Sequence, residues 1–471
     1  MPKALLPAAL LVAVLGAGCA HAPTRPGPTE PAAGAPARLS IPVQYYRLAN
    51  GLRVVLSQDT SVPTVTVGVY YHIGFRIEPK GRTGFAHLFE HLMFQETENL
   101  SKGEAERIVA GNGGISNGST RFDYTNYYEA VPSHVLEPAL FVEAERMRAL
   151  SLSAASLQNQ KDVVKNEVRV NVLNRPYGAF PWLDLPQVAN VNWYNAHNFY
   201  GELDEIDAAT LDDVRAFHDA YYVPSNAVLV VAGDFDEAAA RAAIERQFGS
   251  LPARAEPARP DVSEPEQLAP RAAERTDVLA PRPALAFGYT LPPRGTPEWY
   301  AFGLIDEILV QGEDSRLYRR LVNERKYSDG IEGGINLLGN MFDYEGPTQW
   351  AVYLLHDASS KPAAITADLD AVIAELQRNP VPAAELERAR TKIRSELYDL
   401  AGSPTRFGLV GILAAFSLFD DDPTRINRIE DEFAKVTPAL VRETARKYLV
   451  PSRRTTLTLL PGKPATTEAA P

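Results

Sequence analysis

The sequence predicts an α+β protein built from two similar domains, each a mainly antiparallel sheet covered by helices. Three features support this fold. Strand-like and helix-like periodicities alternate along the chain, a segment rich in Pro, Ala and charge divides it, and the second half repeats part of the first. At about 150 residues per domain, 471 residues are enough to form both.

The first half begins, after a Pro-rich stretch, with two strands around the Asn50-Gly51 turn. VTVGVYYHIGF follows as a third strand, and ISNGSTRF and YTNYYEAVP are two more. A last strand is expected over 226–232. Apolar residues at helical spacing predict helices over 84–94, 102–112, 133–148, 155–172, 210–221 and 235–247.

The second half carries the same pattern. TLDDVRAFHDAYYVPSNAVLVVAG (210–233) and TPALVRETARKYLVPSRRTTLTLL (437–460) share Thr, Val-Arg, Tyr and Val-Pro-Ser in register. AASLQNQKDVVKNE (154–167) also matches AAELERARTKIRSE (383–396) at nearly the same offset. The repeat predicts two copies of one fold, between which a cleft can form. The predicted ranges are a signal peptide (1–19), a tether (20–40), an N-terminal domain (41–250), a linker (251–277), a C-terminal domain (278–462) and a tail (463–471).

Composition excludes several classes of protein. Lys and Arg number 47 against 59 Asp and Glu, a net charge of −12 that argues against a nucleic-acid binder held by phosphate contacts. After the first twenty residues, no stretch has the ~18 to 20 apolar residues of a membrane span. The single cysteine, Cys19, excludes an intrachain disulfide and a zinc site built from cysteines.

The N-terminus predicts export. One Lys precedes an apolar run from Ala4 to Leu15, and small residues lead to Cys19. This pattern resembles a bacterial lipoprotein signal with a lipidated cysteine, although Gly16 stands where such signals favour Leu. A non-lipidated secretory signal is the alternative. The Pro/Ala-rich residues 20–40 would then tether the protein to the bacterial outer membrane, facing the periplasm or the cell surface.

His87-Leu88-Phe89-Glu90-His91 is the clearest chemical signal. Residues four apart lie on one face of a helix, so His87 and His91 can bind one metal ion, and Glu90 lies beside that face. This order is the reverse of His-Glu-x-x-His and is called inverzincin. A catalytic zinc needs a third protein ligand and one open position. Glu167 is a candidate for that ligand; otherwise it is a solvated helical glutamate, and the two histidines are a chance pair.

Together, HLFEH, the glutamate of NEVR and NGSTRFDYTNYYEAVP resemble the pitrilysin, insulysin and mitochondrial processing peptidase family. The resemblance covers nearly the whole chain after residue 40. It implies a zinc endopeptidase in which His87, His91 and Glu167 bind the metal. Glu90 would act as the general base, taking a proton from water and passing it to the leaving amine. One zinc ion per chain is expected, because the counterpart helix FGLIDEIL has no histidine.

The resemblance also implies residues that bind substrate. Asn117, with Gly118 and Ser119 on the strand that follows, would pair with an extended peptide through main-chain hydrogen bonds, unless Asn117-Gly118 is simply a turn. In the second half, relatives carry an Arg and a Tyr near the scissile bond. Tyr327 is present, but Val322 stands where the Arg is expected, and Arg320 is a possible substitute.

Gln160 is a second departure from the family pattern, since many relatives have a glutamate there. It can hydrogen-bond a metal ligand but adds no charge. We therefore expect a zinc-dependent endopeptidase that cleaves unfolded peptides. It would pair with a related subunit that lacks the zinc motif, or with a second copy. The alternative is a non-catalytic assembly or scaffold subunit of the same family.

Overall fold

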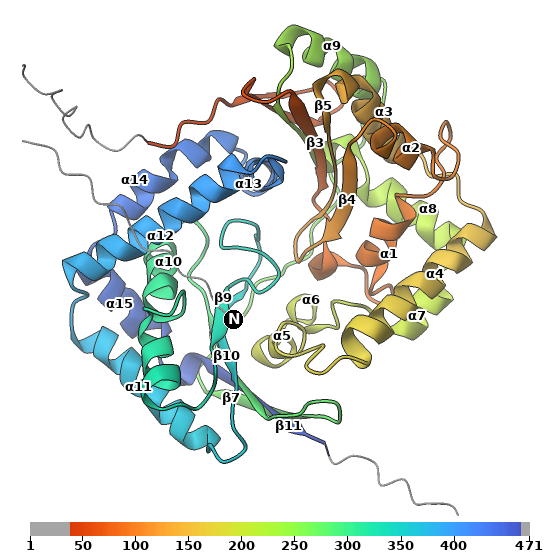
Figure 1. Ribbon diagram of the computed structural model, residues 1–471. Coiled ribbons are helices and arrows are strands. Elements are labelled where there is room, and N and C mark those ends of the chain that lie inside the picture. The colour runs from red at the N-terminus through yellow and green to blue at the C-terminus, as the bar shows by residue number, and fades with distance from the viewer. Residues whose placement is uncertain (1–37, 463–471) are drawn as a thin grey trace, which may run out of the picture. The chain divides into compact units, whose positions relative to one another are not determined.

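Two mixed sheets, one in each half of the chain, organise the structure (Figure 1). The computed structural model describes residues 38–462, and from Leu39 onward the chain forms one compact unit. The predicted signal peptide with Cys19, the tether up to residue 37 and the tail at 463–471 lie outside the described residues.

The first sheet is six-stranded, in the order β1-β2-β6-β3-β5-β4. Its first two strands flank the predicted turn, where Gly51 adopts φ +94°, a conformation that favours glycine. Strands β2 and β6 are parallel, and the other neighbours are antiparallel. The strands are β1 (Gln44–Arg47), β2 (Arg53–Gln58), β3 (Thr64–Tyr71), β4 (Ile115–Thr120), β5 (Thr125–Pro132) and β6 (Ala227–Gly233).

The second sheet repeats the order of the first without the counterpart of β1. It runs β7-β11-β8-β10-β9, and β7 and β11 form its parallel pair, as β2 and β6 do in the first. The predicted fold class, two similar α+β domains with mainly antiparallel sheets, is therefore confirmed. The strands are β7 (Arg271–Asp277), β8 (Ala284–Thr290), β9 (Glu332–Ile335), β10 (Gln349–Leu355) and β11 (Arg454–Pro461).

The helices also follow the repeat. Thr210 and Thr437 occupy matching positions, and the side chain of each accepts a backbone N–H in the first turn of its helix. Helix α1 packs on α4 as α10 packs on α12 (Figure 1). The first-half helices are α1 (Phe85–Leu92), α2 (Glu104–Ala110), α3 (Leu136–Arg148), α4 (Ala154–Val168), α5 (Asp184–Ala189), α6 (Trp193–Ala196), α7 (Leu203–Ala208), α8 (Leu211–Tyr221) and α9 (Glu237–Phe248). Those of the second half are α10 (Pro297–Leu309), α11 (Pro362–Arg378), α12 (Ala383–Gly402), α13 (Phe407–Phe419), α14 (Ile429–Ala434) and α15 (Pro438–Tyr448).

One helix of each half packs on the sheet of the other half. Helix α13 packs on β2, β3 and β6 of the first sheet, and α5 packs on β7, β8 and β11 of the second. Strand β6 is consequently buried along its whole length. Within residues 38–462, no single helix is long and apolar enough to cross a membrane. Helices α12 and α13 meet that criterion only as a pair, and the pair is bent by 106°.

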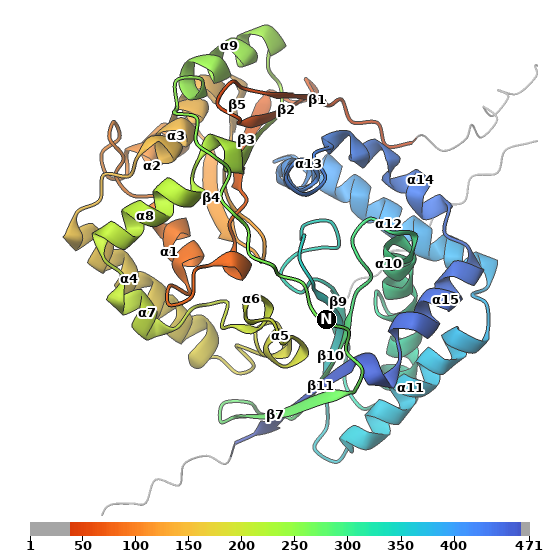
Figure 2. The same cartoon turned by 180° about the vertical axis from the view of Figure 1, so that it is seen from behind.

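The linker between the two halves is shorter than the sequence predicts. Arg271–Asp277, placed in the linker by composition, forms strand β7 at the edge of the second sheet. Most of its side chains are exposed or half-buried, so its sequence is polar and lacks the apolar alternation of a strand with one buried face. The irregular connection between α9 and β7 therefore ends at residue 270 (Figure 2).

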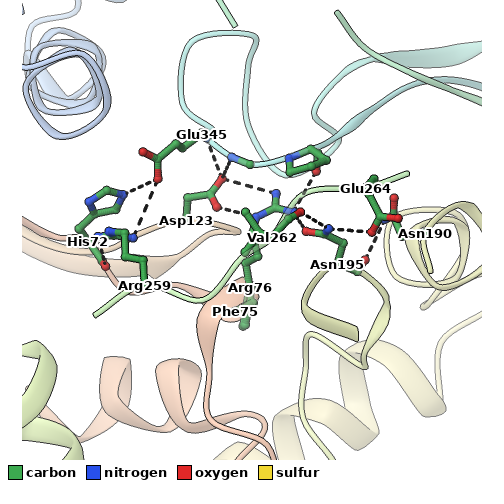
Figure 3. Close-up of polar contacts among 12 residues, drawn as sticks. His72, Phe75, Arg76, Asp123, Asn190, Asn195, Arg259, Val262, Glu264 and Glu345 are labelled. Carbon is green, nitrogen blue, oxygen red and sulfur yellow. Dashed lines mark hydrogen bonds and ion pairs between the residues drawn. The ribbon is translucent and has the colours of Figure 1, made fainter. Parts of the chain in front are cut away.

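A buried ion pair joins the two halves (Figure 3). Arg76 donates from Nε to Asp123 Oδ1 at 2.6 Å, and both side chains are buried. Asp123 also accepts the amides of Glu345 and Gly346 from the second half, while Arg76 Nη1 donates to the carbonyl of Pro347. Arg76 and Asp123, which flank helix α1 in the sequence, thus bind the first half to the second.

Candidate metal centre

Helix α1 carries the predicted histidine pair, and a buried carboxylate holds its first turn. Glu78 accepts the amides of Gly84 and Ala86 at 2.9 and 2.6 Å, which satisfies two backbone donors that the helix leaves free. Gly84 adopts φ +80°, and a Cβ atom there would lie 2.9 Å from Ile206. Local packing therefore sets where α1 begins.

His87, His91 and Glu167 come together as the sequence predicts. The two Nε2 atoms lie 3.3 Å apart. Glu167 reaches from α4, its Oε1 3.6 Å from His87 Nε2 and its Oε2 3.2 Å from His91 Nε2. One ligand atom from each residue lies within 4.8 Å of the others. Hydrogen bonding to His87 and His91 holds the pKa of Glu167 well below its usual range.

This donor set fits zinc. Two imidazole nitrogens and one carboxylate oxygen form the His₂Glu set of catalytic zinc sites, which leaves one position for water or substrate. His87 is buried, whereas the His91 and Glu167 side chains are 22% and 32% exposed. Water and peptide can therefore reach the open side of the cluster.

The side chain of Glu90 has a hydrogen-bond partner that is not shared by the three candidate ligands. The hydroxyl of Thr120, at the end of β4, donates to Glu90 Oε2 at 2.7 Å. Glu90 is half-buried and stands next to His91 in α1, but it is not part of the gathered group. Its carboxylate is therefore available beside the cluster.

Tyr200, which no sequence motif marks, also contacts the cluster. Its hydroxyl donates to Glu167 Oε1 at 3.2 Å, and its ring packs edge-on against His87 with centroids 4.9 Å apart. Burial raises the pKa of Tyr200 above its usual range, so it remains a donor at neutral pH. Neither Tyr200 nor Thr120 belongs to a metal motif, and only the folded chain brings them to the site.

The predicted peptide-binding segment forms the edge strand β4. In the described sheet β4 pairs only with β5, so its other edge is open to an extended peptide. Asn117 and Gly118 lie within the strand, opposite Tyr128 and Tyr127, so they do not form a turn. The hydroxyl of Ser119 donates to Asn126 at 2.6 Å, which secures β4 to β5.

Among residues 38–462, no hydrogen bond joins the remaining predicted residues to the cluster. Gln160 is buried on α4, and within residues 38–462 it makes no hydrogen bond to His87, His91 or Glu167. Arg320 and Tyr327 instead meet at Asp368 on α11. Arg320 Nε donates to Asp368 Oδ1, and the hydroxyl of Tyr327 to Oδ2, both at 2.8 Å. Both side chains are therefore hydrogen-bonded to Asp368 within the second half.

Family models match both halves of the chain. The model described as insulinase (peptidase family M16) matches residues 53–176, which include His87, Glu90, His91 and Glu167. The model described as peptidase M16 inactive domain matches residues 208–393. The chain belongs to the M16 family of peptidases. The two-domain architecture is that of M16-like peptidases of known structure.

Relatives of this M16 chain include proteins named as zinc proteases. The zinc protease PqqE of Helicobacter pylori is 27% identical over 88% of this chain and 92% of its own length. The crystal structure of a protease from H. pylori matches with a TM-score of 0.81 and 26% identity, over 89% of this chain and all of that one. The periplasmic protease PqqL of Escherichia coli shares the fold at 17% identity and a TM-score of 0.72. This chain covers 49% of PqqL.

Proposed function

We propose that this chain is a zinc-dependent endopeptidase that cleaves unfolded peptides. The observation that carries the proposal is the cluster of His87, His91 and Glu167, with the Glu90 carboxylate beside it and outside the ligand set. The names of the H. pylori relatives support it. Three ligands that leave an open position suit catalysis better than a purely structural zinc site.

In the proposed reaction His87, His91 and Glu167 hold the zinc ion. When bound, zinc would supply Lewis-acid chemistry, activating water and polarising the peptide carbonyl. Glu90 accepts a proton from the attacking water and returns it to the leaving amine. Thr120 orients Glu90 through its hydrogen bond, and Tyr200 orients Glu167. The open edge of β4 holds the peptide extended, so substrates must be unfolded.

We also propose that the active species is a pair of chains, the partner being a related subunit without the zinc motif. PqqL is about twice the length that this chain covers, and Val322 stands where the family resemblance leads us to expect a substrate-binding Arg. Export and lipid anchoring through Cys19 remain part of the proposal. An active monomer at nanomolar concentration would refute the pairing.

The test is cleavage of a mixed pool of unfolded peptides by the purified chain, alone and with related subunits from the same source, alongside measurement of its metal content. We expect one zinc ion per chain and cleavage that a chelator abolishes and added zinc restores. Zinc-loaded protein that cleaves no peptide under any of these conditions would instead favour the non-catalytic subunit. A protein of the same fold from Pseudomonas fluorescens is described as a peptidase M16 inactive domain, which supports this non-catalytic alternative.

A further inference from the structure

The second half contains a counterpart of the metal site that has carboxylates in place of histidines. When HLFEHLMFQ is aligned with GLIDEILVQ, helix α10 matches α1, and both segments end in a glutamine. Helix α12 packs on α10 and carries Glu396, the repeat counterpart of Glu167. The residues that replace His87, Glu90, His91 and Glu167 are therefore Gly303, Asp306, Glu307 and Glu396.

These four residues line a cavity of about 530 Å³ between α10, α12 and β9. Gly303 stands where the first half places His87, and the Met341 side chain packs closely against it, since a Cβ atom there would lie 2.9 Å from Met341 Cε. Another carboxylate, Glu332, also lines the cavity, and no Lys, Arg or His does so. Apolar side chains form much of the remaining wall, among them Val310, Ile331, Ile335, Ile393, Leu397 and Leu400.

Asn336 Oδ1 is a buried oxygen atom of this cavity without a hydrogen-bond partner within residues 38–462, and the residue is 3% exposed. Glu307 is 5% exposed, and its carboxyl hydrogen-bonds to Glu396. Asn336 uses its Nδ2 to donate to the carbonyl of Asn340 and to Asp343, which fixes its oxygen as the unused group. Asn336 Oδ1 can only accept, so a ligand that satisfies it must be a donor.

No ion pair neutralises the carboxylates from inside the described chain. Lys392 is on α12, but its Nζ donates to the carbonyl of Gln311 and to Asp314. Burial, and then the charges of Glu396 and Asp306, raise the pKa of Glu307 well above its usual range, so Glu307 keeps a proton at neutral pH. Glu307 is therefore neutral, and a cation that pairs with it must displace this proton.

We propose that this cavity binds the guanidinium group of an arginine side chain of a peptide. Guanidinium is planar and spreads five N–H donors over several directions, which suits separated acceptors. A single bare ion suits this cavity less well, because the described His, Cys, Asp and Glu side chains gather three ligand atoms within 4.8 Å only at His87, His91 and Glu167. The apolar wall accommodates the methylene groups of the arginine.

The proposal deepens the proposed function and rests on it, since it names a side chain that a peptide substrate would present. Its test measures binding, so it gives an answer whether or not the chain cleaves peptides. The protein is the full chain with the substitution Glu90→Gln, which prevents turnover in the proposed mechanism. The probes are acetyl-Ala-Arg-Ala-amide and the same peptide with citrulline, which is nearly isosteric with arginine but neutral.

We expect calorimetry to show saturable binding of the arginine peptide and at least ten-fold weaker binding of the citrulline peptide. Adding Glu307→Gln and Glu396→Gln should weaken arginine binding at least ten-fold. Glu387→Gln removes the same charge from an exposed position on α12 and should leave binding unchanged. Equal affinity for both probes, undiminished binding by the double variant, or displacement of the arginine peptide by micromolar Ca²⁺ or Mg²⁺ would overturn the proposal.

A folding measurement keeps the binding result interpretable. Because Glu307 is a protonated, buried carboxyl, an amide of the same shape replaces it without leaving a charge unpaired. Glu307→Gln should therefore melt at or above the temperature of the parent protein. Its loss of arginine binding can then be assigned to the cavity, and full arginine binding by this folded variant would count against the site.

Discussion

Two half-buried glutamates near the histidine pair differ in their hydrogen-bond partners. Glu167 faces His87 and His91 and accepts from Tyr200, whereas Glu90 accepts from Thr120 on the edge strand. The contacts of Glu167 suit a metal ligand, and those of Glu90 suit a general base. Substitutions at these positions should therefore separate metal binding from proton transfer.

The repeat offers a matched pair of variants for the metal ligand. Glu167→Ala removes one of three ligands and should abolish stoichiometric zinc binding. Glu396→Ala removes the counterpart glutamate of the second half, where no histidine faces it, and should retain one zinc ion per chain. Metal analysis of both purified proteins is the measurement. Equal zinc content would exclude Glu167 from the ligand set.

Thr120 should affect turnover without affecting zinc. Thr120→Val removes the hydrogen bond to Glu90, and such a bond to a charged group contributes roughly 1.5–3 kcal/mol, or about 10- to 100-fold in rate. Thr120→Ser keeps the hydroxyl and should recover most of the activity. Peptide cleavage by zinc-verified protein distinguishes the two. If serine and valine are equally impaired, the methyl packing of Thr120 matters rather than its hydroxyl.

At the scale of elements, the start of α1 depends on a close approach between two glycines. Gly201 adopts φ +87°, and a Cβ atom there would lie 2.4 Å from the Cα of Gly84. Since Gly84 immediately precedes α1, any adjustment at this contact moves the helix that carries His87 and His91. The metal geometry thus depends on a loop more than 100 residues away along the chain.

Gly201→Ala should destabilise the fold more than Gly81→Ala does. Gly81 also has positive φ, +79°, but its Cβ would meet nothing within 4 Å, so alanine there pays only the conformational strain of about 1–2 kcal/mol. Alanine at 201 adds an overlap with backbone, worth a further ~1–3 kcal/mol. Denaturant unfolding of the two variants gives the comparison. Equal losses would mean that the loop moves away freely.

On the scale of the whole molecule, the Arg76–Asp123 pair links the halves. Burial alone would raise the pKa of Asp123, but the Arg76 guanidinium and the Glu345 amide together hold it below its usual range. A carboxyl whose pKa is lowered by folding stabilises the native state above its unfolded pKa of about 3.9. That stability is lost as the pH falls through the folded value.

Asp123→Asn should therefore lower the free energy of unfolding by about 3–5 kcal/mol at neutral pH, because Arg76 remains buried without its counter-charge. The difference from the parent should begin to shrink below the unfolded pKa of about 3.9 and should shrink further as the pH falls through the lower folded pKa. Unfolding curves at pH 7 and at about pH 2 measure both effects. A constant difference across this range would remove the ion pair as the cause.

The sequence predicted features that depend on local periodicity or on the repeat. The spacing of His87 and His91 follows from one helical turn, and the strand order of the second sheet follows from duplication. Contacts between distant segments carry no local pattern, so Tyr200, Thr120 and Glu78 were missed. The polar strand β7 was mistaken for linker because an exposed edge strand needs little apolar sequence.

Glu90→Gln is the most direct test of the central claim, which is that Glu90 transfers the proton while His87, His91 and Glu167 hold the metal. Zinc content and cleavage of an unfolded peptide should be measured on the same protein, with the exposed Glu137→Gln on α3 as the control. We predict one zinc ion per chain, a stability equal to the parent, and a loss of about 100-fold or more in turnover for Glu90→Gln alone. Near-parental turnover by zinc-loaded Glu90→Gln protein would contradict the account.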